Sequence, residues 1–230
     1  MPRQSATLQA PETAPDQGKI RVAEVIYQAL RLDIAFGRLM PRQRLVESDL
    51  CERFQTTNHN VRQAFELLDR VGLIERKANR GVEVKALSAA ELHDLYEVRV
   101  MLQREGARLL DLSRIPELVA ALTSVNSTYE AALDADRLEA AAEANDAFHR
   151  ILFDYCSNAE LARLQHSYWL NASAIISRAL TDKTLSQNSR KDHRAIIAAI
   201  EAGDVDRLIE VTVGHIRPAV DVYRRLYGLF

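Results

Sequence analysis

The 230-residue sequence has few glycines, only two cysteines and no long apolar run. No stretch approaches the ~20 apolar residues of a membrane-spanning helix, and residues 1–18 lack the apolar segment of a secretory signal. We therefore expect a cytoplasmic protein without membrane attachment. Cys51 and Cys156 match no metal or redox spacing, so buried, reduced thiols are expected.

The net charge of −2 conceals an asymmetry between the two parts of the chain. Residues 1–86 hold 14 Lys and Arg against 11 Asp and Glu, a surplus of +3, whereas residues 87–230 hold 16 against 21, giving −5. Only the first part has the sign that favours DNA. Because +3 is modest, affinity would depend on where the charges lie and on two copies acting together.

A helix-turn-helix pattern occupies Leu45 to Arg62 and continues into the following helix. Two short apolar stripes at helical spacing are separated by the polar turn Gln55-Thr56-Thr57. An ordinary helical hairpin would give the same pattern. As a DNA reader, the second helix would present four polar residues near its N-terminus: Thr57, Asn58, His59 and Asn60.

The residues that follow favour a winged helix. Two strand-like runs, Leu73 to Arg76 and Val82 to Lys85, are joined by a segment that reads as a hairpin with a basic tip. Gly81 permits the positive φ or close approach that such a tip needs. A helical stripe over about residues 20–36, stopped by Gly37, supplies the domain's first helix.

The run PRQRLVESDLCERFQTTNHNVRQAFELLDRVGLIERKANRGVEV resembles the winged-helix domain of GntR-type transcriptional regulators. The resemblance implies that Thr57, Asn58, His59 and Asn60 meet base edges, while the backbone and wing contacts come from Arg44, Arg62, Lys77, Arg80 and Gly81. Members of the family commonly have Ser-Arg at the start of the second helix of the motif, and this sequence has Thr57-Asn58 there. Because Asn suits adenine and Arg suits guanine, a different operator is expected.

Beyond Leu87 the sequence predicts only helices. Ser88 and Glu91 form a capping box, and stripes of period 3.6 predict six helices at 88–112, 116–133, 136–156, 158–180, 187–202 and 204–227. The expected fold is mainly α: a winged helix-turn-helix followed by an all-α helical bundle. Its domains are a disordered tail (1–19), the winged domain (20–86) and the bundle (87–230).

The runs LYEVRVMLQREGARLL, NDAFHRILFDYCSN, DHRAIIAAIEAGD and GHIRPAV resemble the FCD domain, the helical effector module of the FadR branch of GntR regulators. Six helices are similar to the VanR-type subgroup. The resemblance implies a domain that binds a ligand or metal and forms dimers.

Three histidines of this half are placed by helix geometry. His193 lies ten residues before Gly203 and His215 eleven after Asp204, so both would stand ~15 Å from the turn of a helical hairpin. Asn145 and His149 share one face of another helix. The alternative is that these are hydrogen-bonded core histidines. The family implies a metal site with Asn145, His149, His193 and His215, suited to a divalent transition metal such as Zn, Ni or Mn.

Arg99 lies on a helix near an apolar stripe, where it would either reach solvent and pair with Glu97 or point inward. The resemblance implies that it faces the effector cavity, where its planar fork could hold a carboxylate. Tyr96, Tyr168, Trp169 and Asn171 could line the same cavity, although aromatics at helical spacing also occur in plain cores.

These features lead to one main hypothesis and two alternatives. The main hypothesis is a repressor that binds a pseudo-palindromic operator in double-stranded DNA as a homodimer, controlled by a small carboxylate bound to the metal and Arg99. A metal sensor without an organic effector is one alternative. A metal-dependent hydrolase is the other, but no Glu or Asp is clearly placed as its general base.

Overall fold

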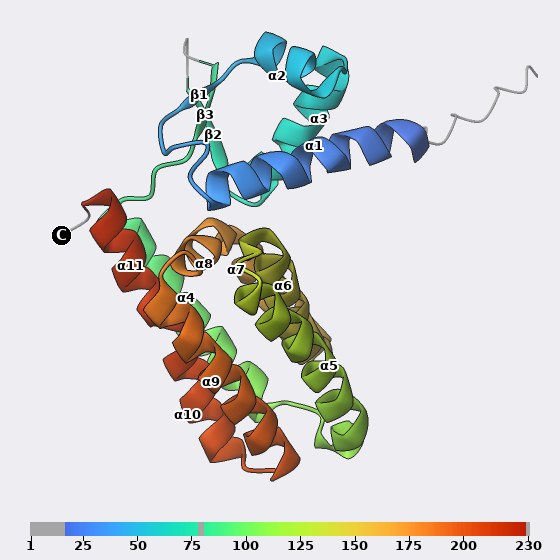
Figure 1. Ribbon diagram of the computed structural model, residues 1–230, viewed down its shortest axis with the longest axis vertical. Helices are drawn as coiled ribbons and strands as arrows, with labels where there is room; N and C mark the ends of the chain where they lie inside the picture. Colours follow the sequence, from blue (N-terminus) through green and yellow to red (C-terminus); the bar gives the residue numbers. More distant parts are fainter. Residues whose placement is uncertain (1–16, 78–80, 229–230) are drawn as a thin grey trace, which may run out of the picture.

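The computed structural model describes residues 17–77 and 81–228 and places them in two domains stacked along the long axis of the molecule (Figure 1). The N-terminal domain contains α1 (Gln17–Ala35), β1 (Arg44–Leu45), α2 (Glu47–Phe54), α3 (Asn58–Arg70), β2 (Ile74–Lys77) and β3 (Gly81–Val84). The C-terminal domain contains α4 (Ala89–Arg108), a 3-10 turn (Leu112–Arg114), α5 (Ile115–Asp134), α6 (Leu138–Asp154), α7 (Ala159–Asn171), α8 (Ser173–Ala179), α9 (Lys183–Glu201), α10 (Val205–Ile216) and α11 (Pro218–Tyr227).

The N-terminal domain has the winged helix-turn-helix architecture expected from the sequence. The apolar stripes of α1 and α3 meet in one core, where Leu30, Phe65 and Leu68 are fully buried. Strands β2 and β3 pair antiparallel, with Ile74 opposite Val84. A third strand, β1, pairs with the other edge of β3. It was not predicted, because two residues are too few to show an alternating pattern.

Helix α1 begins at Gln17, inside the range assigned to a disordered tail; residues 1–16 lie outside the described structure. The helix ends before Gly37, whose φ of 72° lies in the left-handed region. A Cβ on Gly37 would stand 2.5 Å from Arg178 Nη1, and the same nitrogen donates a hydrogen bond to the Phe36 carbonyl at 2.7 Å. Gly37 is therefore favoured by its backbone conformation, and a side chain there would have to displace the Arg178 guanidinium.

The replacement Gly37→Ala is expected to lower the free energy of unfolding by about 2–3 kcal/mol, since it adds displacement of Arg178 to the cost of left-handed alanine. The matched variant is Gly203→Ala, because Gly203 has a similar φ of 66° and open space around it. It should cost only about 1–2 kcal/mol. Urea unfolding of both variants measures the difference. Equal losses would show that Arg178 adjusts freely.

The C-terminal half is helical as expected, but two of its six predicted helices are each divided in two. The range 158–180 is divided at Ala172, whose φ of −96° and ψ of 0° leave the helical region. The range 204–227 is divided at Arg217 because Pro218 has no N–H to continue the hydrogen-bond ladder. The first break lets α8 turn across the bundle toward α1 (Figure 1).

Two local predictions have different outcomes. The capping box is confirmed, since Glu91 N donates to Ser88 Oγ at 3.2 Å and Ser88 N donates to Glu91 Oε2 at 2.9 Å. Cys51 and Cys156 are both free, as expected of reduced thiols, but the expectation that they are buried is wrong, because both are only half-buried. Cys51 lies in the short helix α2, and Cys156 follows the end of α6.

The two domains meet along α1, which lies on the side of the winged domain facing the helical bundle (Figure 1). Arg31 on α1 pairs with Asp146 on α6 at 3.0 Å, and Arg38 pairs with Glu139 at 2.8 Å. Across the described part of the chain, no helix has the length and apolar character needed to span a membrane.

Candidate functional site

The N-terminus of α3 presents most of the expected base-reading residues to solvent. Thr57 is the N-cap, and Thr57, Asn58 and His59 are exposed. Asn58 Oδ1 accepts a hydrogen bond from the Cys51 thiol at 3.2 Å, which links the two helices of the motif. Asn60 is only half-exposed, and its Nδ2 donates to Thr56 Oγ1 at 2.9 Å. The Asn60 side chain thus stabilises the turn through Thr56, whereas the side chains of Thr57, Asn58 and His59 are exposed enough to reach DNA.

The basic side chains expected to contact the DNA backbone lie on α3 and on the sheet. Arg62 pairs with Glu47 at 2.9 Å and Lys77 pairs with Glu75 at 2.8 Å, yet both basic side chains remain exposed. The side-chain hydrogen bond to Glu75 raises the pKa of Lys77, so its charge is secure. Arg44 lies beside Gly81, which has the expected positive φ of 81°. Arg80, the remaining predicted wing residue, lies outside the described residues.

The change Asn58→Ala should weaken binding to the preferred DNA by ~1–3 kcal/mol and relax one base position. The Asn58 side chain is exposed, so the fold should be retained. Arg62→Gln is the contrasting variant, since loss of a phosphate contact weakens all sequences alike. Fluorescence anisotropy on oligonucleotides selected by the protein from a random library measures both. An unaltered base preference in the Asn58 variant would remove Asn58 from the readout set.

The three histidines expected to converge do so inside the C-terminal domain. His149 on α6, His193 on α9 and His215 on α10 each offer one ring nitrogen within 4.8 Å of the others. The nitrogens His149 Nε2 and His215 Nε2 stand 3.2 Å apart. Two nitrogens that share one metal ion at ~2.0–2.1 Å, at angles of 90–109°, are separated by about 2.8–3.4 Å.

Neighbouring polar groups fix which nitrogen of His193 faces the cluster. Glu130 is held as a carboxylate, because the hydrogen bond from Arg194 lowers its pKa. It can only accept, so the Asn126 amide directs its NH₂ to Glu130 at 2.9 Å and its oxygen to His193 Nδ1 at 3.0 Å. His193 Nδ1 must therefore carry the proton, and the lone pair on Nε2 faces the other histidines.

The same reasoning applies to His215, whose Nδ1 lies 3.2 Å from Asp192 Oδ2. A carboxylate accepts, so His215 Nδ1 donates, and Nε2 is the nitrogen that faces His149. Within the described residues, His193 Nε2 has no hydrogen-bond partner, and neither has His149 Nδ1. Buried ring nitrogens without partners are unusual, and the lone pair of His193 Nε2, which faces the other two histidines, is available to a ligand.

Burial keeps two of the three rings neutral. Desolvation, followed by repulsion from His215, lowers the pKa of both His149 and His193 well below the usual value. Neutral imidazoles are the form that binds metals, so no proton must be displaced from these rings near neutral pH. Phe148 stacks on His193 at 4.0 Å between ring centroids and excludes water from it.

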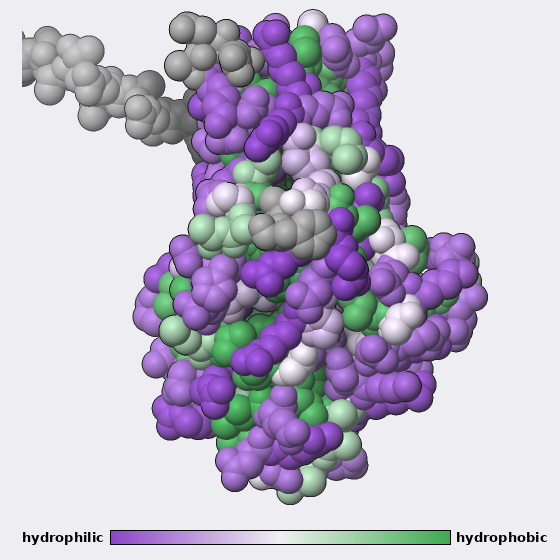
Figure 2. Space-filling view, turned by 90° about the vertical axis from the view of Figure 1, so that its left-hand side faces the viewer, coloured by the Kyte–Doolittle hydropathy of each residue, from purple (hydrophilic) through white to green (hydrophobic). Residues whose placement is uncertain are grey.

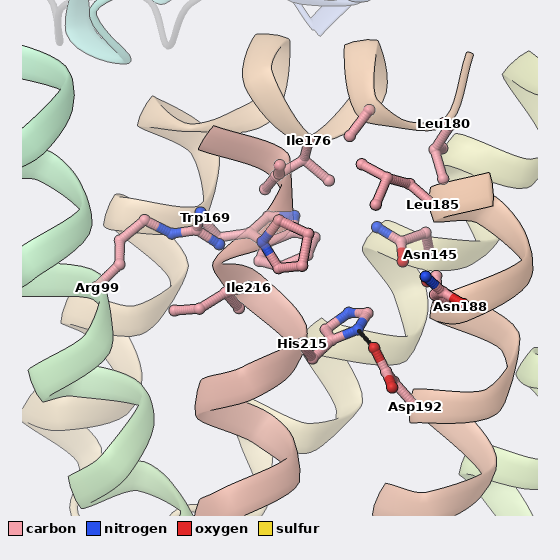
Figure 3. A pocket seen from close by; sticks show the side chains of 14 residues that line it. Arg99, Asn145, Trp169, Ile176, Leu180, Leu185, Asn188, Asp192, His215 and Ile216 are labelled. Atoms are coloured by element: carbon pink, nitrogen blue, oxygen red, sulfur yellow. Dashed lines mark hydrogen bonds and ion pairs between the residues drawn. The ribbon is translucent and has the colours of Figure 1, made fainter. Parts of the chain in front are cut away.

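Asn145 is buried one turn before His149 and lines the same cavity as His215 (Figure 3). Its neighbour Asp146 points away, to the domain boundary, where it pairs with Arg31. The donor set that the structure brings together is therefore three imidazoles, with the neutral amide of Asn145 on the wall of the adjoining cavity. It fits a divalent transition metal, and the unpartnered nitrogens support that fit.

Arg99 points inward rather than to solvent. It is 5% exposed, and its guanidinium carbon lies 4.7 Å from the Tyr96 ring centroid and 5.4 Å from that of Trp169. Glu97 does not pair with it but stays at the surface beside His93. In the part of the chain that the structure describes, Arg99 Nη1 has no hydrogen-bond partner. Arginine is almost never buried without an anion, so this guanidinium has the charge and the free donor to bind one.

Arg99 and His215 line one cavity of about 60 Å³ between α4, α6, α9 and α10 (Figure 3). An aliphatic wall is formed by Ile176, Leu180 and Leu185, which lie together, and Ile216 lies on the side of Arg99 (Figure 3). Tyr96 packs against the Arg99 guanidinium. Tyr168 and Arg99 together line a separate small pocket. Asn171 lies elsewhere, at the domain boundary with Val84 and Leu87. It is not among the cavity-lining residues, because α7 ends there and its last turn faces the winged domain.

Sequence patterns did not reveal Asn126, Glu130 or Asp192, which orient the histidines. Asp192 precedes His193 in sequence but contacts His215 on the next helix. Asn126 and Glu130 come from α5, and no signal in the sequence pairs α5 with α9. The distance of each histidine from the turn, measured along its helix, predicts which rings lie at the same level. Which residues form hydrogen bonds with those rings depends on how the helices rotate against one another.

Two family models match the chain. The model described as bacterial regulatory proteins, gntR family, matches residues 22–84, and the FCD domain model matches residues 94–218. The "Uncharacterized HTH-type transcriptional regulator BphR" of Paraburkholderia xenovorans is 28% identical over 90% of this chain and 86% of its own length. The "Probable D-xylose utilization operon transcriptional repressor" of Paenarthrobacter nicotinovorans is 27% identical, covering 85% of each chain.

Two solved structures share the fold. A GntR transcriptional regulator from Rhodococcus sp. RHA1 has a TM-score of 0.68 at 22% identity and covers 94% of this chain and 100% of its own. The E. coli protein McbR/YncC has a TM-score of 0.70 at 16% identity, covering 90% and 98%. At these identities the likeness concerns the fold alone.

Proposed function

The chain belongs to the GntR family of bacterial regulatory proteins, and from that premise we propose a repressor controlled by a small organic acid in its FCD domain. The family consists of DNA-binding transcriptional regulators rather than enzymes, which removes the hydrolase hypothesis. The proposal adds a divalent transition metal, a homodimer and a pseudo-palindromic operator in the cytoplasm.

One observation carries the effector proposal: ring nitrogens without partners and an unpaired, buried guanidinium occur in one small region. His149, His193, His215 and Asn145 would hold the metal, and Arg99 would hold a carboxylate. When bound, the metal would supply a positive charge to which the carboxylate of the effector coordinates. The aliphatic wall would receive the apolar part of the acid.

A homodimer is supported by the surface of the helical domain. On the face shown in Figure 2, hydrophobic residues gather over the C-terminal domain, and Met101 on α4 is 61% exposed. Exposed apolar patches of this kind often mark association surfaces. Two copies related by a two-fold axis would place two copies of α3 on two related half-sites, which accounts for the expected pseudo-palindrome.

The size of the cavity favours a second candidate, a sensor in which the metal is itself the signal. About 60 Å³ holds a few water molecules but not the body of an organic acid. The organic-acid proposal therefore requires the aliphatic wall to move on binding, whereas a pure metal sensor requires no such opening.

The deciding experiment measures DNA release under controlled metal. The chelator-treated protein is loaded with Zn, Ni or Mn, metal content is determined by native mass spectrometry, and anisotropy follows binding to selected DNA while small carboxylates are added. The proposal expects about one metal per chain and release only when both metal and acid are present. Release by buffered metal alone would establish the metal sensor. No metal and no response to any acid would overturn both candidates.

A further inference from the structure

Trp169, the only tryptophan in the sequence, forms the partition between two cavities. It lines the effector cavity beside Arg99 (Figure 3), and it also lines a groove of about 500 Å³ between α1, α6 and α7. The effector cavity lies inside the helical domain, whereas the groove opens at the boundary with the winged domain. A side chain that belongs to both walls can transmit a change from one to the other.

On the cavity side, Trp169 touches two groups of the proposed binding site. Its ring stacks on His149 with 4.1 Å between centroids, and the Arg99 guanidinium carbon lies 5.4 Å from its centroid. A ligand that moves either group must therefore move or reshape the contact with the indole. Because protein interiors are close-packed, a displacement of His149 or Arg99 cannot be absorbed by empty space and is passed on to the indole.

On the groove side, the indole N–H donates to Asp146 Oδ1 at 2.9 Å. The second oxygen, Oδ2, accepts from Arg31 Nη1 at 3.0 Å. Arg31 belongs to α1 of the winged domain and is only 7% exposed, while its Nε is bonded to Gln28. Asp146 thus bridges the two domains with one oxygen on each side, and it directly follows the cavity residue Asn145.

We propose that Trp169, Asp146 and Arg31 couple occupancy of the effector cavity to the position of α1; this inference rests on the proposed function. A turn of the Trp169 ring withdraws the N–H from Asp146 and releases the carboxylate to a new orientation. Arg31 is nearly buried, so it either follows the carboxylate of Asp146 or moves α1 into solvent. The empty and occupied cavities then favour different placements of the winged domain.

The domain boundary offers a matched control. Glu139, also on α6, pairs with Arg38 across the boundary at 2.8 Å, but this pair is half-exposed and touches neither Trp169 nor the cavity. Exposed pairs contribute little. Glu139→Gln and Asp146→Asn therefore remove equivalent charges from the same helix, and only the second interrupts the proposed path. The amide of Asp146→Asn can still accept the indole N–H, so the variant is conservative.

The test needs no effector, because coupling between two sites is reciprocal. In one direction, Arg31→Gln changes α1, and the fluorescence emission of Trp169 and its quenching by acrylamide report the effect at the cavity wall. In the opposite direction, Trp169→Phe keeps an aromatic ring at the cavity wall but loses the N–H, and hydrogen–deuterium exchange measures the effect on α1. We expect quenching to rise at least about twofold in Arg31→Gln and Asp146→Asn, and exchange protection of α1 to fall about tenfold in Trp169→Phe.

Glu139→Gln should leave all of these signals at wild-type values. Equal responses from Glu139→Gln and Asp146→Asn would overturn the inference, as would unchanged quenching in Arg31→Gln. Titration with Zn²⁺ alone then connects the path to the site: Trp169 emission should shift, and the change in α1 exchange should be lost in Asp146→Asn. Zn²⁺ failing to bind would count against the proposed metal site, while the ligand-free measurements would still decide the coupling.

Discussion

The variant His193→Ala is expected to bind divalent metal at least about 100-fold more weakly than the wild type. Structural zinc sites with four ligands are worth about 10–16 kcal/mol, so one ligand accounts for roughly 3 kcal/mol, and each 1.4 kcal/mol is tenfold in affinity. The lone pair of His193 Nε2 faces the cluster, and nothing in the described structure occupies it. Competition with a chelator of known affinity, combined with native mass spectrometry, measures the loss.

Two further variants give the expected result its specificity. Asn126→Leu removes the acceptor that fixes the His193 tautomer, and loss of such an orienting partner costs ~10–100-fold. His166→Ala is the control, because His166 pairs with Asp154 outside the cluster. Metal affinity that fell in His166→Ala, or stayed constant in His193→Ala, would contradict the assignment.

The second large effect is a loss of stability in mild acid when metal is absent. The pKa values of His149 and His193 are lowered in the folded protein, chiefly by desolvation, from a usual value of 6.5. The unfolded chain therefore binds two protons that the folded chain excludes, and the free energy of unfolding falls as pH decreases through 6.5. At pH 5.5 each ring should contribute a loss of about 1.4 kcal/mol, so that the two together approach 3 kcal/mol.

Urea unfolding at pH 7.5 and pH 5.5, in the presence of a chelator, measures this difference. His193→Phe serves as the comparison, because Phe148 stacks on the His193 ring and a phenyl ring keeps that contact without titrating. About half of the loss between the two pH values should disappear in this variant. A loss identical to that of the wild type would mean that His193 is not responsible.

The helix-turn-helix, the wing and the helical bundle followed from local pattern. Gly37 and Gly81 marked turns that need positive φ, and the capping box at Ser88 marked the first helix of the bundle. Periodicity does not reveal the two breaks, since Ala172 carries no local signal and the apolar stripe continues past Arg217 and Pro218. Local sequence thus specifies which face of a helix is apolar and where the helix ends, whereas packing against other helices specifies where it bends.

The approach of His193 to His215 was a consequence of helix rise and turn position, both of which the sequence contains, whereas His149 joined them in the prediction through the family resemblance. By contrast, the sequence alone could not decide whether Arg99 faced inward. An Arg beside an apolar stripe is compatible with either face, and the choice depends on how α4 rotates against α7 and α10.

The sequence by itself determined the family, the two kinds of domain and the set of histidines, because these depend on residue identity and on spacing along single helices. The tertiary structure decided which atoms face which. It assigned the ring tautomers through Asn126 and Asp192, left Arg99 without an anion, and placed Asp146 between Trp169 and Arg31. Such relations join residues far apart in the chain, and they arise only when the rotation and depth of each helix are fixed by packing.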